Sequence, residues 1–271
     1  MLNTKFIRKV GYFRWAIRYA RFQFQKRILR REMQMRLPTG SMIILPLDHS
    51  VSNIYVTGAN IDWGAEALFA KFADRRRDFL DIGAHIGYYS NYLSPLMRHV
   101  YAFEPDRRNL PALRRNAALC RNIEIVEKAV SSRDGNARLA LGSNSSTNML
   151  QPTGGATTIE VSVTTVDTFV AEHPDIDVGL IKTDIEGHDV QALKGMKRTV
   201  KRFQPLILSE CGNEPELPGL LRDWGYRIFA FVGDRKTLSF SFQEFSPETL
   251  QSAWTMMIFL TPPHINFTGH T

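Results

Sequence analysis

From residue 78 onward, short apolar runs alternate with segments of helical spacing, and this alternation constrains the fold more than any other feature of the sequence. The runs are apolar on both faces, as strands buried between two layers of helices are. The pattern predicts an α/β fold with a mostly parallel sheet covered by helices on both faces. The expected strands are 79–83, 99–104, 123–130, 158–166, 178–183, 205–209, 226–232 and 254–260, and the expected helices are 88–96, 107–119, 188–200 and 215–224.

The charge of the chain is unevenly distributed. Residues 1–36 hold eleven Lys or Arg and one acid, Glu32, which gives this leader a net charge of +10. The whole chain carries +7, so the remaining residues have a net charge of −3. The basic isoelectric point therefore says nothing about what the main domain binds. We divide the chain into a basic leader (1–37), a connecting segment (38–77) and a main domain (78–271).

Apolar residues of the leader recur at helical spacing. The stripe consists of Phe6, Val10, Phe13, Ile17, Ala20, Phe24 and Ile28, with Lys9, Arg14, Arg18, Arg21 and Arg27 beside it. At about 100° per residue these apolar positions share one side of an α-helix. Such a helix either packs its stripe on the main domain or on a second subunit, or lies on an anionic membrane surface. Nucleic acid is disfavoured because the rest of the chain offers no basic face, and a mitochondrial presequence because the segment contains no Ser.

The connecting segment begins with Pro38 and Gly40, which interrupt the helical spacing. We expect a small hairpin from the runs 42–47 and 53–57, with a polar turn between them, followed by a helix over 61–72. No run of the sequence approaches the roughly 18 apolar residues of a membrane-spanning helix. The chain has only two cysteines, which excludes a disulfide framework or a Cys-rich zinc site and favours a reducing compartment.

The first strand of the main domain runs into a glycine turn, Asp81-Ile-Gly83-Ala84-His85-Ile-Gly87. Open α/β sheets bind ligands at the carboxyl ends of their strands, and glycine lets backbone N–H groups come close to a ligand. The G-x-x-x-G spacing lacks the third glycine of a pyrophosphate cradle. Asp81 stands where it could hold a cationic amine or a hydroxyl. Taken alone, the glycines are explained equally well by a tight strand-to-helix turn.

An acidic residue follows the second strand. Glu104 lies 21 residues after Gly83 and can accept hydrogen bonds from both hydroxyls of a ribose. NAD and S-adenosylmethionine both present such a ribose. The missing glycine argues against the pyrophosphate of NAD, whereas Asp81 suits the cationic amino-acid end of S-adenosylmethionine. The sequence therefore favours S-adenosyl-L-methionine as the cofactor.

Five motifs follow one another along the main domain. They are Phe79-Leu-Asp-Ile-Gly-Ala-His-Ile-Gly-Tyr-Tyr-Ser, Phe103-Glu-Pro-Asp with Asn109 and Asn116, Val163-Thr-Thr-Val-Asp167-Thr-Phe, Ile181-Lys-Thr-Asp184-Ile-Glu186-Gly-His-Asp189, and Leu206-Ile-Leu-Ser-Glu210. Together they resemble the FkbM family of S-adenosylmethionine-dependent methyltransferases over roughly residues 40–260. His85 departs from the Asn that is usual in the family motif, and Asp189 departs from the usual Glu.

The resemblance implies a class I Rossmann-like methyltransferase with a seven-stranded sheet whose last strand is antiparallel. It also implies methyl transfer to oxygen, often on a sugar or a natural product. The residues expected to bind the cofactor are Asp81, Gly83, Ala84, His85, Gly87, Tyr88, Glu104, Pro105, Ala129 and Asp184.

Charged residues gather at the end of the fourth core strand. Lys182, Asp184 and Glu186 alternate, and charges packed so closely at a buried strand end are costly unless they are paired or used. Asp184, Glu186 and Glu210 are candidate bases for a substrate hydroxyl, with His188 behind them and Lys182 in the same catalytic group. The structural alternative is a Lys182–Glu186 ion pair with Asp184 as a helix cap. We assign no metal site, although a metal held by these carboxylates would serve the same purpose.

The expected function is O-methyl transfer from S-adenosylmethionine to a hydroxyl of a sugar, glycan or natural product, by in-line attack on the sulfonium methyl. The alternatives are an NAD-dependent oxidoreductase and a non-catalytic nucleotide-binding protein associated with membrane. Expected partners are a small-molecule or glycan acceptor and, through residues 1–36, an anionic membrane surface. Nucleic acid is not expected, and a homo-oligomer is left open. We expect a cytoplasmic protein, either free or at the inner membrane face, with its acceptor site shaped by the polar segment 143–158 and the hairpin at 42–57.

Overall fold

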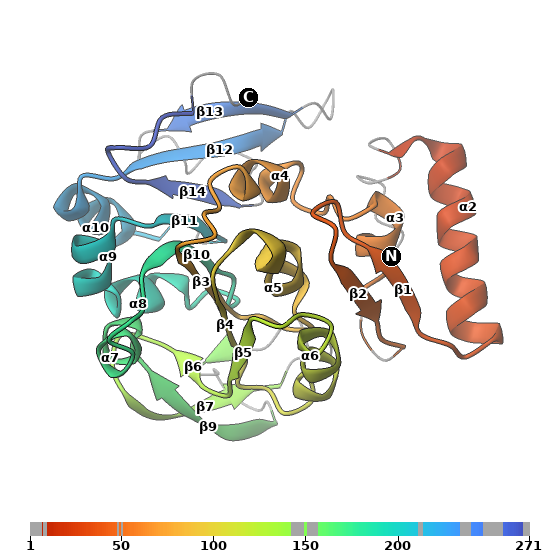
Figure 1. Cartoon of the computed structure of the whole chain (residues 1–271), viewed down its shortest axis with the longest axis horizontal. Helices are drawn as coiled ribbons and strands as arrows, with labels where there is room; N and C mark the ends of the chain where they lie inside the picture. The colour runs from red at the N-terminus through yellow and green to blue at the C-terminus, as the bar shows by residue number, and fades with distance from the viewer. Residues whose placement is uncertain are drawn as a thin grey trace.

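The computed structural model describes residues 7, 10–47, 49, 51–141, 149–150, 157–210, 214–233, 240–245 and 257–267. Its centre is one large sheet with helices on both faces (Figure 1). In sheet order the strands are β13 (Phe240–Phe245), β12 (Arg227–Gly233), β14 (Ile258–Thr261), β11 (Leu206–Ser209), β10 (Val178–Thr183), β3 (Asp78–Ile82), β4 (Val100–Phe103) and β5 (Ile123–Val126).

The direction of the strands confirms the predicted Rossmann-like class. Five strands from β11 to β5 run parallel, and the last strand of the chain, β14, is antiparallel to both of its neighbours. The sheet has one strand more than the predicted seven, because β13 adds an antiparallel edge beside β12. Every residue of β3, β11 and β14 is buried, which explains why these runs are mostly apolar; the exceptions in β3, Asp78 and Asp81, are paired with Arg98 and Lys182.

Two layers of helices cover the sheet. Alternate residues of β3 point to opposite faces, so Phe79 packs into one hydrophobic cluster and Leu80 into the other. The cluster around Phe79 includes α4 (Ala65–Ala70), α5 (Tyr88–Leu93) and α6 (Leu110–Ala117), and the cluster around Leu80 includes α7 (Val166–Glu172), α8 (Asp189–Lys194), α9 (Lys197–Phe203) and α10 (Leu217–Trp224).

A second, smaller sheet lies beside the main one. Its order is β6 (Ala129–Val130), β9 (Thr158–Thr164), β7 (Gly135–Ala140) and β8 (Met149–Leu150). The single strand predicted over 123–130 is therefore two strands in different sheets, because the backbone leaves the main sheet after Val126. The polar segment 143–158 falls mostly on 142–148 and 151–156, which lie outside the described residues.

The hairpin predicted over 42–57 is wrong. β2 (Met42–Leu45) pairs antiparallel with β1 (Met33–Arg36), so the partner strand comes from the leader. The run after the polar turn forms α3 (Ser52–Thr57), although it is rich in β-branched residues. Ile54 and Val56 are both buried in this short helix, and their burial outweighs their strand propensity.

The leader helix is confirmed over its described part. It consists of α2 (Tyr12–Gln23), which continues into the π-helical turn η1 (Phe24–Ile28). In Figure 1 this helix stands at the edge of the molecule, where it contacts α3. Within the part of the chain that the structure describes, no helix has the length and apolarity needed to cross a bilayer.

Candidate active site

A cleft of about 230 Å³ lies where the order of the parallel strands reverses, at the carboxyl ends of β3, β4 and β10. This is the place at which open α/β sheets bind ligands. Eight of the residues predicted for the site line the cleft. They are Gly83, His85, Glu104, Pro105, Ala129, Asp184, Glu186 and Glu210.

The turn after β3 is fixed by a close backbone approach. Gly83 has a φ of +79°, and a Cβ atom at this position would lie 2.1 Å from the carbonyl oxygen of Asp184. Only glycine fits there, because both the conformation and the space exclude a side chain. The Nζ atom of Lys182 donates a hydrogen bond of 2.8 Å to the Gly83 carbonyl oxygen, so the ends of β3 and β10 are held together.

Two residues that line the cleft adopt the left-handed backbone region without being glycine. They are His85, with a φ of 54°, and Glu186, with a φ of 51°. Such a conformation costs roughly 1–2 kcal/mol per residue, and it concentrates at functional sites. His and Asn are among the side chains that tolerate this region best, which gives the departure from Asn at position 85 a physical reason.

Glu104 projects from the end of β4 and is only 5% exposed. Its two carboxylate oxygens accept backbone hydrogen bonds from His85 at 2.8 Å and from Asp106 at 2.9 Å. Burial raises the pKa of Glu104 to about 7, with these hydrogen bonds acting in the opposite direction. The side chain of Asn109 also donates a hydrogen bond to this carboxylate, so Glu104 keeps only part of its acceptor capacity for a ligand hydroxyl in the cleft.

A buried lysine organises the floor of the site. The Nζ atom of Lys182 lies 3.4 Å from an Asp184 oxygen and 3.6 Å from an Asp81 oxygen. Burial alone would lower the pKa of Lys182, but Asp184 and Asp81 outweigh it and raise the pKa, so the side chain stays charged. The structural alternative, a Lys182–Glu186 ion pair, is therefore wrong, because Lys182 pairs with these two aspartates instead.

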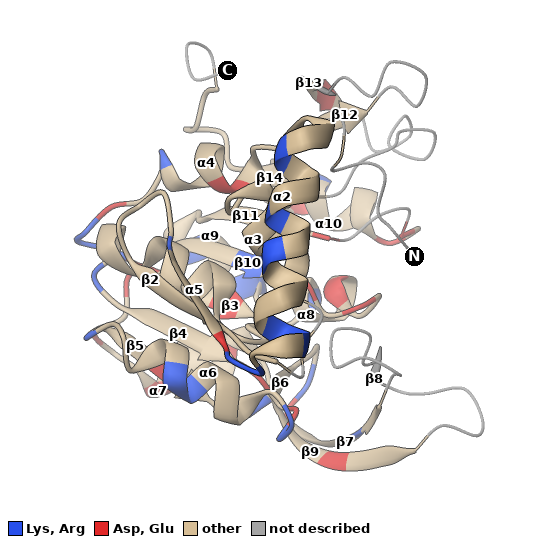
Figure 2. Cartoon of the chain, turned by 90° about the vertical axis from the view of Figure 1, so that its right-hand side faces the viewer, with Lys and Arg blue, Asp and Glu red and all other residues tan. Residues whose placement is uncertain are grey.

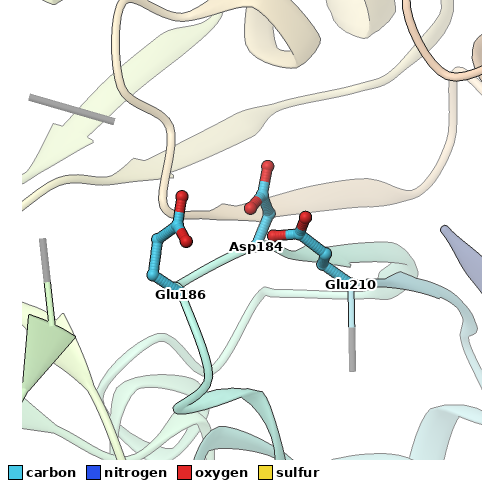
Figure 3. A group of neighbouring side chains, drawn as sticks. All are labelled: Asp184, Glu186 and Glu210. Carbon is cyan, nitrogen blue, oxygen red and sulfur yellow. The ribbon is translucent and has the colours of Figure 1, made fainter. Parts of the chain in front are cut away.

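Three carboxyl groups meet above this lysine. Asp184, Glu186 and Glu210 each place an oxygen within 4.8 Å of the other two (Figure 3). Burial and a hydrogen bond to Asp184 raise the pKa of Glu210 to about 10. Burial also acts to raise the pKa of Asp184, but Lys182 and the hydrogen bond from Glu210 lower it overall. Glu210 is therefore the easier of the two carboxyl groups to protonate, and a hydrogen bond joins it to Asp184.

The remaining predicted site residues do not line the cleft. Asp81 is fully buried and accepts a 2.6 Å hydrogen bond from the Ser90 hydroxyl, so its predicted contact with a cofactor amine stays a prediction. The hydroxyl of Tyr88 donates to Glu66 at 3.1 Å, and Nε2 of His188 lies 2.9 Å from the Ser131 hydroxyl. Ala84 and Gly87 are enclosed by the packing of the turn against α6.

Sequence reasoning missed several residues that line the cleft, among them Asn109, Lys128 and Ile185. Asn109 belongs to one of the five motifs, but nothing in its spacing indicated that it reaches the cleft. Lys128 lies in the connection between β5 and β6, where the chain passes from one sheet to the other, and no sequence pattern marks that crossing.

The fold and the site together are those of a class I methyltransferase. Residues 81–228 match the family model described as the methyltransferase FkbM domain, which is more than half of the chain. The chain therefore belongs to the FkbM methyltransferase family, and the resemblance seen in the motifs is confirmed. The predicted cofactor, S-adenosyl-L-methionine, agrees with this family. The comparison with curated proteins finds no match.

Solved structures of similar fold are distant in sequence. Methyltransferase FkbM from Methylobacillus flagellatus is 16% identical over 78% of this chain and 52% of its own, with a TM-score of 0.45. An rRNA methylase from Streptococcus thermophilus is 11% identical over 73% and 94%, with a TM-score of 0.42. TrmK from M. capricolum, solved with S-adenosyl-homocysteine, is 12% identical over 74% and 71%, with a TM-score of 0.38.

The chain spans about half the length of the Methylobacillus protein. At TM-scores below 0.5, none of the three solved structures identifies a substrate for this chain. The expectation that the acceptor is not a nucleic acid stays a prediction.

Proposed function

We propose that the protein transfers the methyl group of S-adenosylmethionine to a hydroxyl oxygen of a sugar, glycan or natural-product acceptor. One observation carries the proposal. The cleft that contains the Gly83 turn and Glu104 also contains the hydrogen-bonded pair Asp184 and Glu210. Residues suited to a nucleoside and residues suited to proton transfer therefore share one cavity.

The residues of the cleft fit the proposed cofactor chemically. Glu104 lines the cleft with a carboxylate that can accept ribose hydroxyls, and Asn109 beside it is a partner that can yield its hydrogen bond to the ligand. Asp184, Glu186 and Glu210 give one wall of the cleft a group of carboxyl groups, and Asp184, whose pKa is lowered, is ionised. Such a wall is compatible with S-adenosylmethionine, whose sulfonium and ammonium groups outnumber its carboxylate. Gly83 also lines the cleft, and its lack of a side chain lets this turn pack against the backbone of Asp184.

In the proposed reaction an O–CH₃ bond forms as the S–CH₃ bond breaks, and the hydroxyl proton passes to a carboxylate. Asp184 is the proposed acceptor of this proton, because it is ionised and lines the cleft. Its lowered pKa is no obstacle, since the hydroxyl becomes strongly acidic while its oxygen bonds to the methyl carbon. The hydrogen bond with Glu210 and the charge of Lys182 hold Asp184 in place, and alignment of oxygen and methyl supplies much of the rate.

The proposal is tested by incubating the full chain with S-adenosylmethionine labelled in the methyl group and a panel of sugars, oligosaccharides and polyhydroxylated natural products. Label should enter a hydroxyl-bearing acceptor, and the same acceptor with that hydroxyl replaced by hydrogen should take up none. Nicotinamide reduction with the same panel measures the oxidoreductase alternative. Transfer to amines or RNA alone would contradict the acceptor class, and failure to bind the cofactor would contradict the proposal as a whole.

A further inference from the structure

The leader helix turns its predicted apolar stripe outward. Phe13 is 76% exposed, Ile17 55%, Phe24 53% and Ile28 68%. The helix is held to the domain from its opposite side, where Phe22 is only 3% exposed and packs against Tyr55. The alternative in which the stripe packs on the main domain is therefore wrong, since these large side chains all face away from it. Aligned exposed side chains of this size mark an interaction surface.

The cations of the helix divide in the same way. On the inner side, Arg18 and Lys26 donate to the backbone carbonyl oxygens of Val56 and His49. On the outer side, Arg14, Arg21 and Arg27 have no ion-pair partner within the described residues. Figure 2 shows basic positions following one another along α2, which lies across the face of the molecule.

The leader also lacks acids that could neutralise this face. Its one acid, Glu32, lies 2.8 Å from Arg115 of α6 and is thus already paired. The exposed surface therefore combines an apolar line with cations on its flanks, and the helix projects from the edge of the fold rather than lining a groove.

We propose that α2 and η1 form a docking surface for an anionic lipid bilayer, with the helix lying in the plane of the interface. Phe13, Ile17, Phe24 and Ile28 would enter the boundary between headgroups and acyl chains, while the flanking arginines meet lipid phosphates and carboxylates. Both halves of this surface are needed, because buried apolar area and attraction to anionic lipid add together in interfacial helices.

Charge decides between this partner and others. A symmetric contact with a second copy would bring two strongly basic faces together, which is repulsive. Nucleic acid would satisfy the arginines but would leave the apolar line exposed, and the rest of the chain, at a net charge of −3, offers no basic surface to extend the contact. An anionic bilayer satisfies the apolar and the basic residues at once.

The test is cosedimentation of the full chain with vesicles of phosphatidylcholine alone and of phosphatidylcholine with about 30% phosphatidylserine, at low and at high salt. We expect binding to the anionic vesicles at low salt, and loss of most of it at high salt or without phosphatidylserine. Two double variants, Phe13→Ser with Ile17→Ser and Arg14→Glu with Arg21→Glu, should each weaken binding at least about tenfold. Leu119→Ser is the matched control, because Leu119 is an exposed apolar residue, 45% exposed, outside the leader.

S-adenosylmethionine affinity, measured on every variant, shows that the fold is intact and is expected to stay unchanged. The proposal is overturned if the wild-type chain ignores anionic vesicles, or if both double variants bind them as the wild type does. It is also overturned if the chain forms a dimer in ultracentrifugation that the Phe13 and Ile17 substitutions abolish, because the stripe is then a subunit interface.

Discussion

The cleft and the leader helix use charge in opposite ways. In the cleft, carboxyl groups are brought together around Lys182 and are bonded to one another or to backbone N–H groups. On the outer side of α2, cations and large apolar side chains face solvent together. The paired charges of the cleft have shifted pKa values and fixed positions, so substitutions in the cleft should change cofactor binding and methyl transfer. Charges without partners contribute little to folding, so substitutions on that face should leave the cleft intact.

The largest effect is expected from Asp184→Asn, which keeps the shape of the side chain but removes the charge that receives the proton. Turnover should fall by about 100-fold or more. Methyl transfer by the variant is compared with its thermal unfolding midpoint and with Glu186→Gln, a change on a less buried member of the same group. Loss of thermal stability with turnover retained would show that Asp184 serves mainly to neutralise Lys182.

Two phenylalanines of the leader, one buried and one exposed, test whether the inner and outer sides of the helix contribute differently to stability. Phe22→Ala removes a side chain that is 3% exposed and should lower the free energy of unfolding by about 3 kcal/mol. Phe13→Ala removes one that is 76% exposed and should change it by less than about 0.5 kcal/mol. Chemical denaturation of the two variants gives both values. Equal losses would mean that the outer face packs in solution, either on the domain or on another copy.

Glu104→Gln should weaken S-adenosylmethionine binding by roughly tenfold to a hundredfold, since a charge-assisted contact contributes about 1.5–3 kcal/mol. Isothermal titration calorimetry measures the affinity. Glu160→Gln on β9 serves as the control, because Glu160 is an exposed acid of the neighbouring sheet. The assignment of the ribose to Glu104 fails if the folded variant binds the cofactor as tightly as the wild type does.

The same carboxyl group should make cofactor binding depend on pH. The pKa of Glu104 is raised to about 7, and the ionised form is the one that accepts the ribose hydroxyls. Its ionised fraction falls as the pH drops through 7, so affinity should fall by about tenfold between about pH 8 and pH 6. Glu104→Gln should remove that dependence. A wild-type profile without a slope in this range would mean that Glu104 does not contact the cofactor in its ionised form.

The main sheet was predictable because its central strands are buried on both faces, which leaves short, mostly apolar runs in the sequence. The connecting segment was not, because local and tertiary preferences conflict there. Residues 53–57 have strand propensity, yet burial of Ile54 and Val56 against the domain makes them helical. The partner of β2 lies in the leader, across the boundary that charge alone suggested.

Within the site, spacing predicted which strand ends carry residues that line the cleft, but not how the charges pair. Alternation along β10 suggested a pair between Lys182 and Glu186, whereas the neighbouring strand β3 supplies Asp81 as a partner. That contact depends on which strands lie side by side, which the sequence does not state. The sequence also did not predict that the leader stripe points outward, because an apolar stripe identifies one side of a helix but not what that side contacts.

The central claim is that the cleft beside Gly83 holds S-adenosylmethionine with its ribose on Glu104 and its sulfur near Asp184. A crystal structure of the full chain with S-adenosylhomocysteine tests it most directly. The account predicts both ribose hydroxyls within hydrogen-bond distance of the Glu104 carboxylate, and the sulfur atom on the side of the cleft lined by Asp184 and Glu210. A ligand bound elsewhere, or one whose ribose faces Asp184 while Glu104 keeps only its backbone partners, would contradict it.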